Sequence, residues 1–501
     1  MKKLIVLLIV LSISFSLTAA AAPQSGGTLT VGLDDDPPML DPHMSTTRVD
    51  RQVFVSLYDS LLKLDPELNI KPGLAEDWEI SEDGTKYTFH LRNDVVFHDG
   101  TGFNAEAVKF NFERMLDPEL GSPRKSDLDL IEEIEVVDEY TISLKLSKAY
   151  VPFLSTLTDR AGMMISPTAL EKHGEDFSSH PVGTGPFKFV EREMQDRIVL
   201  EKNENYWQEG LPYLDKVIYK PFTDGNVRLV NMTSGELDLI DEVPPKDMEK
   251  LAKDDSVKVS TVSGVGFQGI WINKAVEPFS SDELTQALNY SINRDAIVNV
   301  VFGETAYPGH SPFPPGTSVH DKNREVVQVD TEKAKELLKE GGKAEGYEFN
   351  MLVSPEPTAK QTAQLIQSMA SQVGIKVNIE LLEFGTLIDR LMATNYQAIL
   401  VGWSGRIDPD GNTYRFFHSE GSMNQSNYSN PEVDKLLDES RVETDSQKRK
   451  ELFGEMMQHL DKELPYIFVY HPKELKAHKN RVNGFTPYPD GLMRLHEVWV
   501  D

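Results

Sequence analysis

Hydrophobic residues in the first third of the chain recur at every second position, which is the spacing of half-buried β-strands. Residues 29–33 predict an initial strand. Residues 78–80 and 87–91 alternate on either side of an Asp83-Gly84 turn signal, so they predict an antiparallel hairpin. The same alternation returns at residues 140–146, and this part of the chain therefore predicts a small α+β domain.

The last third of the chain alternates between strand-like and helix-like segments. Residues 349–353, 358–373 and 377–382 predict a strand, a helix and a strand, with the length that a parallel crossover requires. Asn430-Pro431 predicts a helix start, and a charged helical stretch continues from it to about Glu463. A strand is predicted at residues 466–470. A second unit, of α/β type, is therefore expected in the C-terminal half.

Length and composition exclude several classes of protein. A chain of 501 residues is long enough for at least two cores, and 39% apolar with 26% charged residues is a globular composition. The formal net charge of −29 repels phosphate backbones, so nucleic acid is not expected as a partner. The sequence has no cysteine, which excludes disulfides, thiol nucleophiles and thiolate metal sites.

The N-terminus predicts export from the cytoplasm. Met1-Lys2-Lys3 precedes an apolar run from Leu4 to Leu17 and then the alanines of residues 19–22, the order of a secretory signal that is cleaved. Residues 1–21 are therefore excluded from the fold. Without cysteine the mature chain cannot carry a lipid anchor on an N-terminal Cys, so we expect a freely soluble periplasmic protein.

Three runs resemble chemical motifs, but each lacks a required part. Residues 264–269 match the dinucleotide fingerprint, yet a strand-like segment follows where a helix should begin. Residues 408–412 alternate oxygen donors as in a calcium loop, without the glycine at position six and the glutamate at position twelve. Residues 402–405 fall short of a nucleophile elbow. No catalytic residue, metal ligand or cofactor is expected.

Several other runs form a series along the chain. They are Leu74–Trp78 continuing through Tyr87–Arg92 to Phe97–Gly100, then Gly183–Phe187 with Asn203–Trp207, then Ala287–Arg294, then Gly402-Trp403 followed by Asn427–Ser429. In this order they resemble the family 5 extracellular solute-binding proteins of bacterial ABC importers. The series spans nearly the whole chain after the signal segment.

This resemblance implies an α/β, two-lobe periplasmic-binding-protein fold with an extra α+β domain, hinged by two crossover strands. The lobes would close over a ligand and then dock on a membrane permease. The implied function is the extracytoplasmic substrate-binding subunit of an ABC importer for a peptide or peptide-like solute, working as a monomer. The expected division is lobe I at residues 22–48, 166–264 and 475–501, the extra domain at 49–165, and lobe II at 265–474.

The family also implies where the ligand lies. Its members hold peptides as an added strand, which uses main-chain hydrogen bonds and tolerates varied side chains. The alternative for Trp403 is core packing at a strand end, and the alternative for residues 46–48 is an ordinary loop. The implied contacts are Thr46, Thr47 and Arg48, which follow Leu40-Asp41-Pro42, and Gly402, Trp403 and Ser404.

The sequence departs from the family pattern just after Gly402-Trp403. Dipeptide and oligopeptide binders of the family carry an aspartate there, two residues past Gly-Trp-x, which pairs with the ligand's amino terminus. Here Arg406 follows Gly405, and a planar guanidinium binds a carboxylate or phosphate rather than an ammonium. An alignment gap would instead bring Asp408 or Asp410 into the amine-binding role, and the sequence leaves both alternatives open.

Two other functions stay open. The same fold can bind a non-peptide solute, such as a nickel chelate, haem, an oligosaccharide or an opine-like anion, because a fold does not determine its ligand. A secreted hydrolase is the second alternative, but the sequence offers no nucleophile motif for it.

Overall fold

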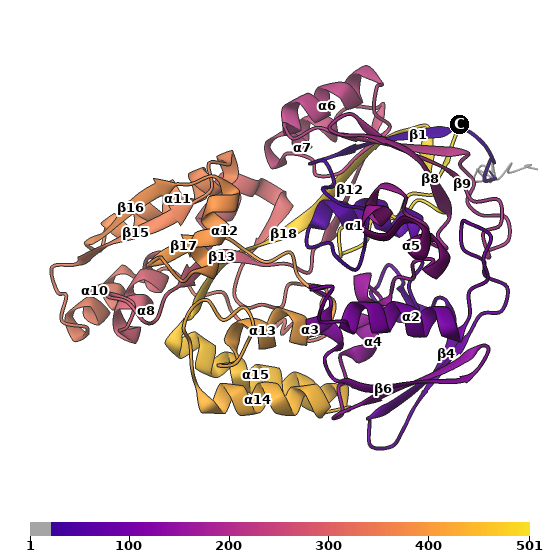
Figure 1. The fold of residues 1–501 in the computed structure, drawn as a ribbon. Helices are drawn as coiled ribbons and strands as arrows, with labels where there is room; N and C mark the ends of the chain where they lie inside the picture. The colour runs from indigo at the N-terminus through magenta and orange to yellow at the C-terminus, as the bar shows by residue number, and fades with distance from the viewer. Residues whose placement is uncertain (1–21) are drawn as a thin grey trace, which may run out of the picture.

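One long strand, β18 (Tyr466–Lys479), joins two groups of strands into a single mixed sheet (Figure 1). The structure is a computed structural model that describes residues 22–501, and the predicted signal segment at residues 1–21 lies outside them. The strands of lobe I are β1 (Thr28–Leu33), β8 (Phe187–Glu193), β9 (Arg197–Lys202), β10 (Lys216–Pro221), β11 (Leu239–Ile240) and β12 (Val257–Ser263). Those of lobe II are β13 (Gln268–Ile272), β14 (Ala306–Pro308), β15 (Tyr347–Val353), β16 (Ile375–Leu381) and β17 (Ala398–Leu400).

In lobe I, β1 pairs in parallel with β10 and β11, and β9 and β8 extend the sheet in antiparallel fashion. Helix α1 (Arg48–Leu57) begins after Thr47, whose side chain accepts a hydrogen bond from the Asp50 N–H. Its Val53 and Phe54 pack into the core of lobe I. The remaining elements here are α5 (Pro167–His173), α6 (Gly225–Ser234), α7 (Met248–Leu251), and the paired β19 (Val482–Asn483) and β20 (Trp499–Val500).

The extra domain is built on an antiparallel sheet of order β4-β5-β7-β6 with its own apolar core. The predicted hairpin is confirmed, because Trp78 lies opposite Phe89 across the turn at residues 81–85. The elements are β2 (Leu62–Leu64), β3 (Ile70–Pro72), β4 (Ala75–Ile80), β5 (Lys86–Leu91), α2 (Ala105–Leu116), α3 (Lys125–Leu128), β6 (Ile131–Asp138), β7 (Thr141–Leu146) and α4 (Phe153–Thr156).

In lobe II, β15 and β16 pair in parallel and α11 (Pro357–Ser371) connects them, which confirms the predicted crossover. The predicted single helical stretch at residues 430–463 is wrong in one respect. It is two helices, α14 (Pro431–Val442) and α15 (Ser446–Glu463), because Asp445 caps a new helix start after a break. The other helices are α8 (Asp282–Ser291), α9 (Arg294–Ile297), α10 (Thr331–Glu340), α12 (Phe384–Met392) and α13 (Tyr414–Phe417).

Two short connections join the lobes. Residues 264–267 link β12 to β13, while β18 pairs with β13 up to Tyr470 and with β12 from Lys473 onward. The strand predicted at residues 466–470 is therefore longer, because its second half pairs with lobe I. Gly269 is required for close packing, since a Cβ there would lie 2.1 Å from the Ile467 carbonyl oxygen. The nucleotide-like run thus leads into strand β13, as predicted.

Two histidines, His43 and His471, are fully buried in the core. Burial lowers the pKa of His43 to about 4 and the pKa of His471 to about 3. A histidine in the unfolded chain titrates near about 6.5. Below that pH the unfolded chain binds protons that the folded protein does not bind, so acid favours unfolding.

We predict that stability falls as the pH is lowered from about 6.5 to about 4, each of these histidines contributing about 1.4 kcal/mol per pH unit. His471→Gln should reduce the slope. His90→Gln, at a side chain that is 42% exposed, should leave it unchanged. Chemical denaturation at a series of pH values measures both, and an unchanged slope in His471→Gln would contradict the prediction.

Candidate functional site

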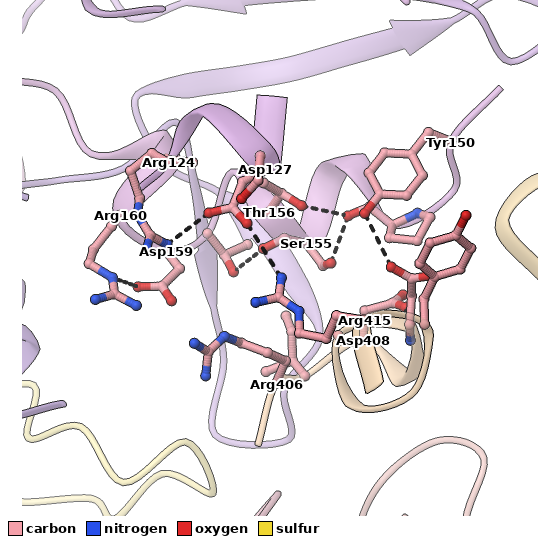
Figure 2. A pocket seen from close by; sticks show the side chains of 18 of the residues that line it. Arg124, Asp127, Tyr150, Ser155, Thr156, Asp159, Arg160, Arg406, Asp408 and Arg415 are labelled. Atoms are coloured by element: carbon pink, nitrogen blue, oxygen red, sulfur yellow. Dashed lines mark hydrogen bonds and ion pairs between the residues drawn. The ribbon is translucent and has the colours of Figure 1, made fainter. Parts of the chain in front are cut away.

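A cavity of about 240 Å³ lies where the extra domain meets lobe II (Figure 2). Its walls come mainly from residues 124–161 of the extra domain and residues 405–441 of lobe II, with Arg51 and Asp490 beside them. The two sides also touch directly, because the Val151 N–H donates to the Arg441 carbonyl at 2.8 Å. The arginines that line the cavity are Arg51, Arg124, Arg160, Arg406, Arg415 and Arg441.

Arg406 lies on the lobe II side of this cavity. Its guanidinium stacks on the Trp403 ring at 4.4 Å and donates to the Gly405 carbonyl at 2.7 Å. No carboxylate of residues 22–501 lies within ion-pair distance of it. Burial in the cavity wall, together with the charges of Arg51 and Arg160, holds the pKa of Arg406 well below its ordinary value. An anion bound here would relieve this excess of positive charge.

Asp159 lies among the arginines on the opposite wall. Arg51 Nε donates to Asp159 Oδ1 at 3.0 Å, and Arg160 Nε lies 3.8 Å from the same oxygen. Arg51 is only 8% exposed and Arg160 only 2%. Burial acts to raise the pKa of Asp159, but Arg51, Arg160 and Arg406 outweigh it and hold that pKa well below its usual range. Burial also lowers the pKa of Arg160 to about 10.

Asp408 and Asp410 already have arginine partners. Arg449 donates to both oxygens of Asp408, at 2.6 and 2.8 Å, and Arg441 donates to both oxygens of Asp410, at 2.7 and 3.1 Å. Such forked pairs use the carboxylate fully. Tyr150 of the extra domain also donates to Asp410, at 3.3 Å. Asp408 and Asp410 therefore line the cavity with their carboxylate oxygens already engaged by arginines.

The Gly402-Trp403-Ser404 segment continues β17, which lies between β15 and β13, past the point where the pairing with β15 ends. Trp403 exchanges two backbone hydrogen bonds with Phe267, at 2.9 and 3.0 Å, and its indole N–H donates to Asn412. Backbone groups alternate in direction along a strand, so those of Gly402 and Ser404 point the other way. Within the described chain these groups have no hydrogen-bond partner. The Trp403 ring packs against the Arg406 guanidinium, and Trp403 is not among the described residues that line the cavity.

Residues 46–48 lie on lobe I, and none of them is among the described residues that line the cavity. Thr47 caps α1 and Thr46 is exposed. Thr47 contacts the cavity wall through Arg160, whose Nη1 donates to the Thr47 carbonyl at 3.4 Å. The structure thus places Gly405 and Arg406 on the cavity lining, while residues 402–404 and residues 46–48 lie outside it.

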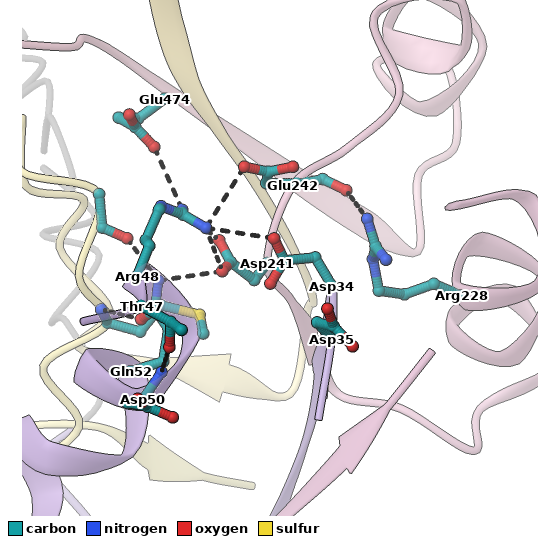
Figure 3. Close-up of polar contacts among 12 residues, drawn as sticks. Asp34, Asp35, Thr47, Arg48, Asp50, Gln52, Arg228, Asp241, Glu242 and Glu474 are labelled. Atoms are coloured by element: carbon teal, nitrogen blue, oxygen red, sulfur yellow. Dashed lines mark hydrogen bonds and ion pairs between the residues drawn. The ribbon is translucent and has the colours of Figure 1, made fainter. Parts of the chain in front are cut away.

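Arg48 is engaged in an acidic network (Figure 3). Its guanidinium donates to both oxygens of Asp241 at 3.1 Å and lies 3.3 Å from Glu242 and 3.6 Å from Glu474. Burial, with the charges of Asp241 and Glu242, raises the pKa of neighbouring Asp34 to about 7. The Arg48 side chain is therefore held by the protein itself.

Sequence reasoning missed most of the cavity arginines. They come from α1, the start of α3, the segment after α4, and α13, which are far apart along the chain. No local spacing marks them, because only the packing of the extra domain against lobe II brings them together. The residues missed are Arg51, Arg124, Arg160, Arg415 and, from α14, Arg441.

Residues 22–501 contain no group of three or more His, Asp or Glu side chains arranged to hold a metal ion. None of the helices in this part of the chain has the length and apolar content needed to cross a membrane. The chemistry of the site therefore rests on guanidinium groups, carboxylates and free backbone groups.

Comparison with known proteins gives a consistent result. The family described as "Bacterial extracellular solute-binding proteins, family 5 Middle" matches residues 69–424. The glutathione-binding protein GsiB of Pectobacterium atrosepticum is 31% identical over 470 residues, which cover 92% of this chain and 91% of the relative.

Solved structures are similar over nearly the whole chain. The periplasmic binding protein DppA of Helicobacter pylori, in complex with the peptide STSA, has a TM-score of 0.85 and 28% identity, covering 95% of this chain and 98% of that chain. The binding protein AgaA from A. tumefaciens R10, in complex with agropinic acid, has a TM-score of 0.83 and 29% identity, covering 95% and 99%.

The pairing of Asp408 with Arg449 generates a prediction about stability. Asp408→Ala should lower the free energy of unfolding by about 3 kcal/mol, because it leaves a largely buried guanidinium without its partner. Asp77→Ala, at a side chain that is 70% exposed, should change stability little. Denaturant unfolding of the unliganded protein measures both, and wild-type stability in Asp408→Ala would show that the pair is not structural.

Proposed function

The chain belongs to the bacterial extracellular solute-binding proteins of family 5, and we propose that it is the substrate-binding subunit of an ABC importer for a short, anionic peptide-like solute. The resemblance and the two-lobe fold predicted from the sequence are both confirmed by the comparisons. The proposed anionic character of the solute rests on one observation. Arg406 faces the cavity between the extra domain and lobe II without a carboxylate partner among residues 22–501.

Arg406 is proposed to bind a carboxylate of the solute. Its ring support from Trp403 fixes the plane of the guanidinium, and the planar fork matches two carboxylate oxygens. Asp408 and Asp410 are poor candidates for an ammonium, because Arg449 and Arg441 already use their oxygens. The Arg406 alternative is therefore the better supported of the two left open by the sequence.

The main chain of the solute is proposed to pair with the free edge at Gly402 and Ser404. Strand addition needs unpaired N–H and C=O groups on an accessible edge, and these residues provide them beside Arg406. Thr46, Thr47 and Arg48 lie outside the cavity lining, next to Arg160 of its wall, and they are proposed as main-chain contacts on the lobe I side once the lobes close.

Capture is proposed to occur by closure about the two connections at residues 264–267 and 471–473. The domain division is the one predicted from the sequence, except that helix α1, predicted to begin the extra domain at residue 49, packs in the core of lobe I. Ligand contacts from both sides favour the closed state, because a solute held by only one wall gains nothing from closure. The closed form then docks on the membrane permease. Export with removal of residues 1–21, and action as a monomer without catalysis, complete this proposal.

A non-peptide anion is the second candidate. The neighbour AgaA was solved with agropinic acid, and an arginine-rich cavity fits any small carboxylate as well as a peptide. Native mass spectrometry of the freshly purified protein, before and after denaturation, distinguishes the candidates by the mass of the retained molecule.

We predict that Arg406→Ala weakens binding of the retained solute by about 2–5 kcal/mol, because a buried charge partner is lost. Arg406→Lys should restore only part of the affinity, since lysine cannot form the fork. Arg197→Ala, at an exposed guanidinium on β9, is the matched control and should bind normally. Titration calorimetry measures all three, and wild-type affinity in Arg406→Ala would end the anchor proposal.

Saturating ligand should also reduce the radius of gyration and raise the melting temperature, because binding selects the closed form and stabilises it by mass action. Small-angle scattering and thermal unfolding, with and without the solute, measure these changes. Confirmed binding that alters neither quantity would contradict closure.

A further inference from the structure

A second pair of arginines lies in the same cavity and comes from both of its sides (Figure 2). Arg124 precedes α3 in the extra domain, and Arg415 lies in α13 of lobe II. Both contact one carboxylate: Arg124 Nη1 lies 2.8 Å from Asp127 Oδ2, and Arg415 Nη2 lies 3.5 Å from Asp127 Oδ1. We infer that Arg124 and Arg415 form a second anion subsite, so that the solute carries two acidic groups.

Most N–H donors of these two guanidiniums have no acceptor among residues 22–501. Each guanidinium carries five N–H donors. Arg415 makes one side-chain hydrogen bond to residues 22–501, the long contact of 3.5 Å to Asp127. Arg124 makes one at 2.8 Å, and its Nε is buried without a partner in the described structure. Since a buried donor is unfavourable when left unpaired, an acceptor supplied from the cavity would be stabilised here.

The carboxylates of the cavity are unevenly distributed among its arginines. Asp408, Asp410 and Asp490 are each paired with one arginine, namely Arg449, Arg441 and Arg494. Asp127 and Asp159 are the carboxylates that pair with its unsatisfied arginines, and each is shared between two of them. Asp129 and Glu420 also line the cavity, but both are exposed and make no ion pair within residues 22–501, so water screens their charge. Apart from the one-to-one pairs and these exposed acids, two carboxylates thus serve five guanidiniums, those of Arg51, Arg124, Arg160, Arg406 and Arg415.

Both subsites can be filled by one molecule. Arg406 and Arg415 lie near the same Trp403 ring, at 4.4 and 5.8 Å, so the subsites are neighbours on the lobe II wall. A solute with a single carboxylate would leave one of them empty. The expected class is a short peptide-like molecule with two carboxylates, such as an acidic dipeptide or a γ-glutamyl peptide. This assignment rests on the proposed function, because it names the solute class for the same cavity.

The position of the second subsite gives it a role in closure. Arg124 and Arg415 face each other across the boundary between the extra domain and lobe II, with Asp127 as their present bridge. A ligand carboxylate that accepts hydrogen bonds from both would tie the two sides together. The second acidic group should therefore stabilise the closed form more than a contact with only one of the two walls would.

The test is a calorimetric titration with matched acid and amide pairs. The probes are glutathione with its two monoamides, Ala-Glu with Ala-Gln, and Gly-Asp with Gly-Asn. In each pair that binds, the diacid should bind about tenfold or more tightly than the amide, because the amide lacks one charged hydrogen bond to the protein. Arg415→Gln and Arg124→Gln should weaken binding of the diacid by a similar factor. They should leave the affinity for the amide, which lacks the second carboxylate, unchanged.

Controls separate binding from folding. Arg197→Gln on β9 should bind every probe like the wild type, and melting temperatures show whether each variant is folded. If Arg415→Gln does not fold, Arg415→Lys and the acid and amide comparison on the wild type decide the question. Equal affinity for acid and amide in every pair that binds would overturn the second subsite and leave the proposed function intact.

A failure of all probes is also informative. The molecule identified by native mass spectrometry then decides, because two acidic groups in it support the second subsite and one or none overturn it. The absence of any retained molecule, together with no binding of any probe, would overturn the proposed function itself.

Discussion

The structure depends on the backbone pairing of one strand, β18, with strands of both lobes. The hydrogen bonds of its first half are made with β13 and β14, and those of its second half with β12 and β11. The two lobes therefore share a continuous sheet at their junction, and the proposed closure would involve the few residues there. Lys476 on this strand also holds Asp241, which binds Arg48 of α1. The hinge and the buried ion network of lobe I are thus parts of one element.

The cavity combines many acidic residues with arginines that lack a carboxylate of their own. A protein with a net charge of −29 repels anions at long range, yet four arginines of the cavity share two carboxylates, Asp127 and Asp159, and Arg406 has none among residues 22–501. Burying a guanidinium beside other arginines is unfavourable, so burial, together with the charges of Arg51 and Arg160, lowers the pKa of Arg406. The arginine without a carboxylate partner is therefore a better guide to the solute than the net charge.

Much of the fold could be predicted from local pattern. The hairpin at residues 78–91 and the crossover at residues 347–381 were predicted correctly, because alternation and helical spacing report which faces are buried. The break at residues 443–445 was missed, since the helical spacing on both sides is similar and only the Asp445 cap separates the helices. β18 was predicted too short, because its second half pairs with a strand two hundred residues earlier in the chain.

By itself, the sequence determined the family, the elements and the exclusion of thiol chemistry, and it singled out Arg406 through a departure from the family pattern. These are properties of residue type and short-range spacing. Only the tertiary structure decided that Asp408 and Asp410 are occupied by Arg449 and Arg441, and that arginines from four distant segments meet beside Arg406. The physical reason is that ion pairing and burial depend on which side chains converge in space, and that convergence follows from the packing of the extra domain against lobe II.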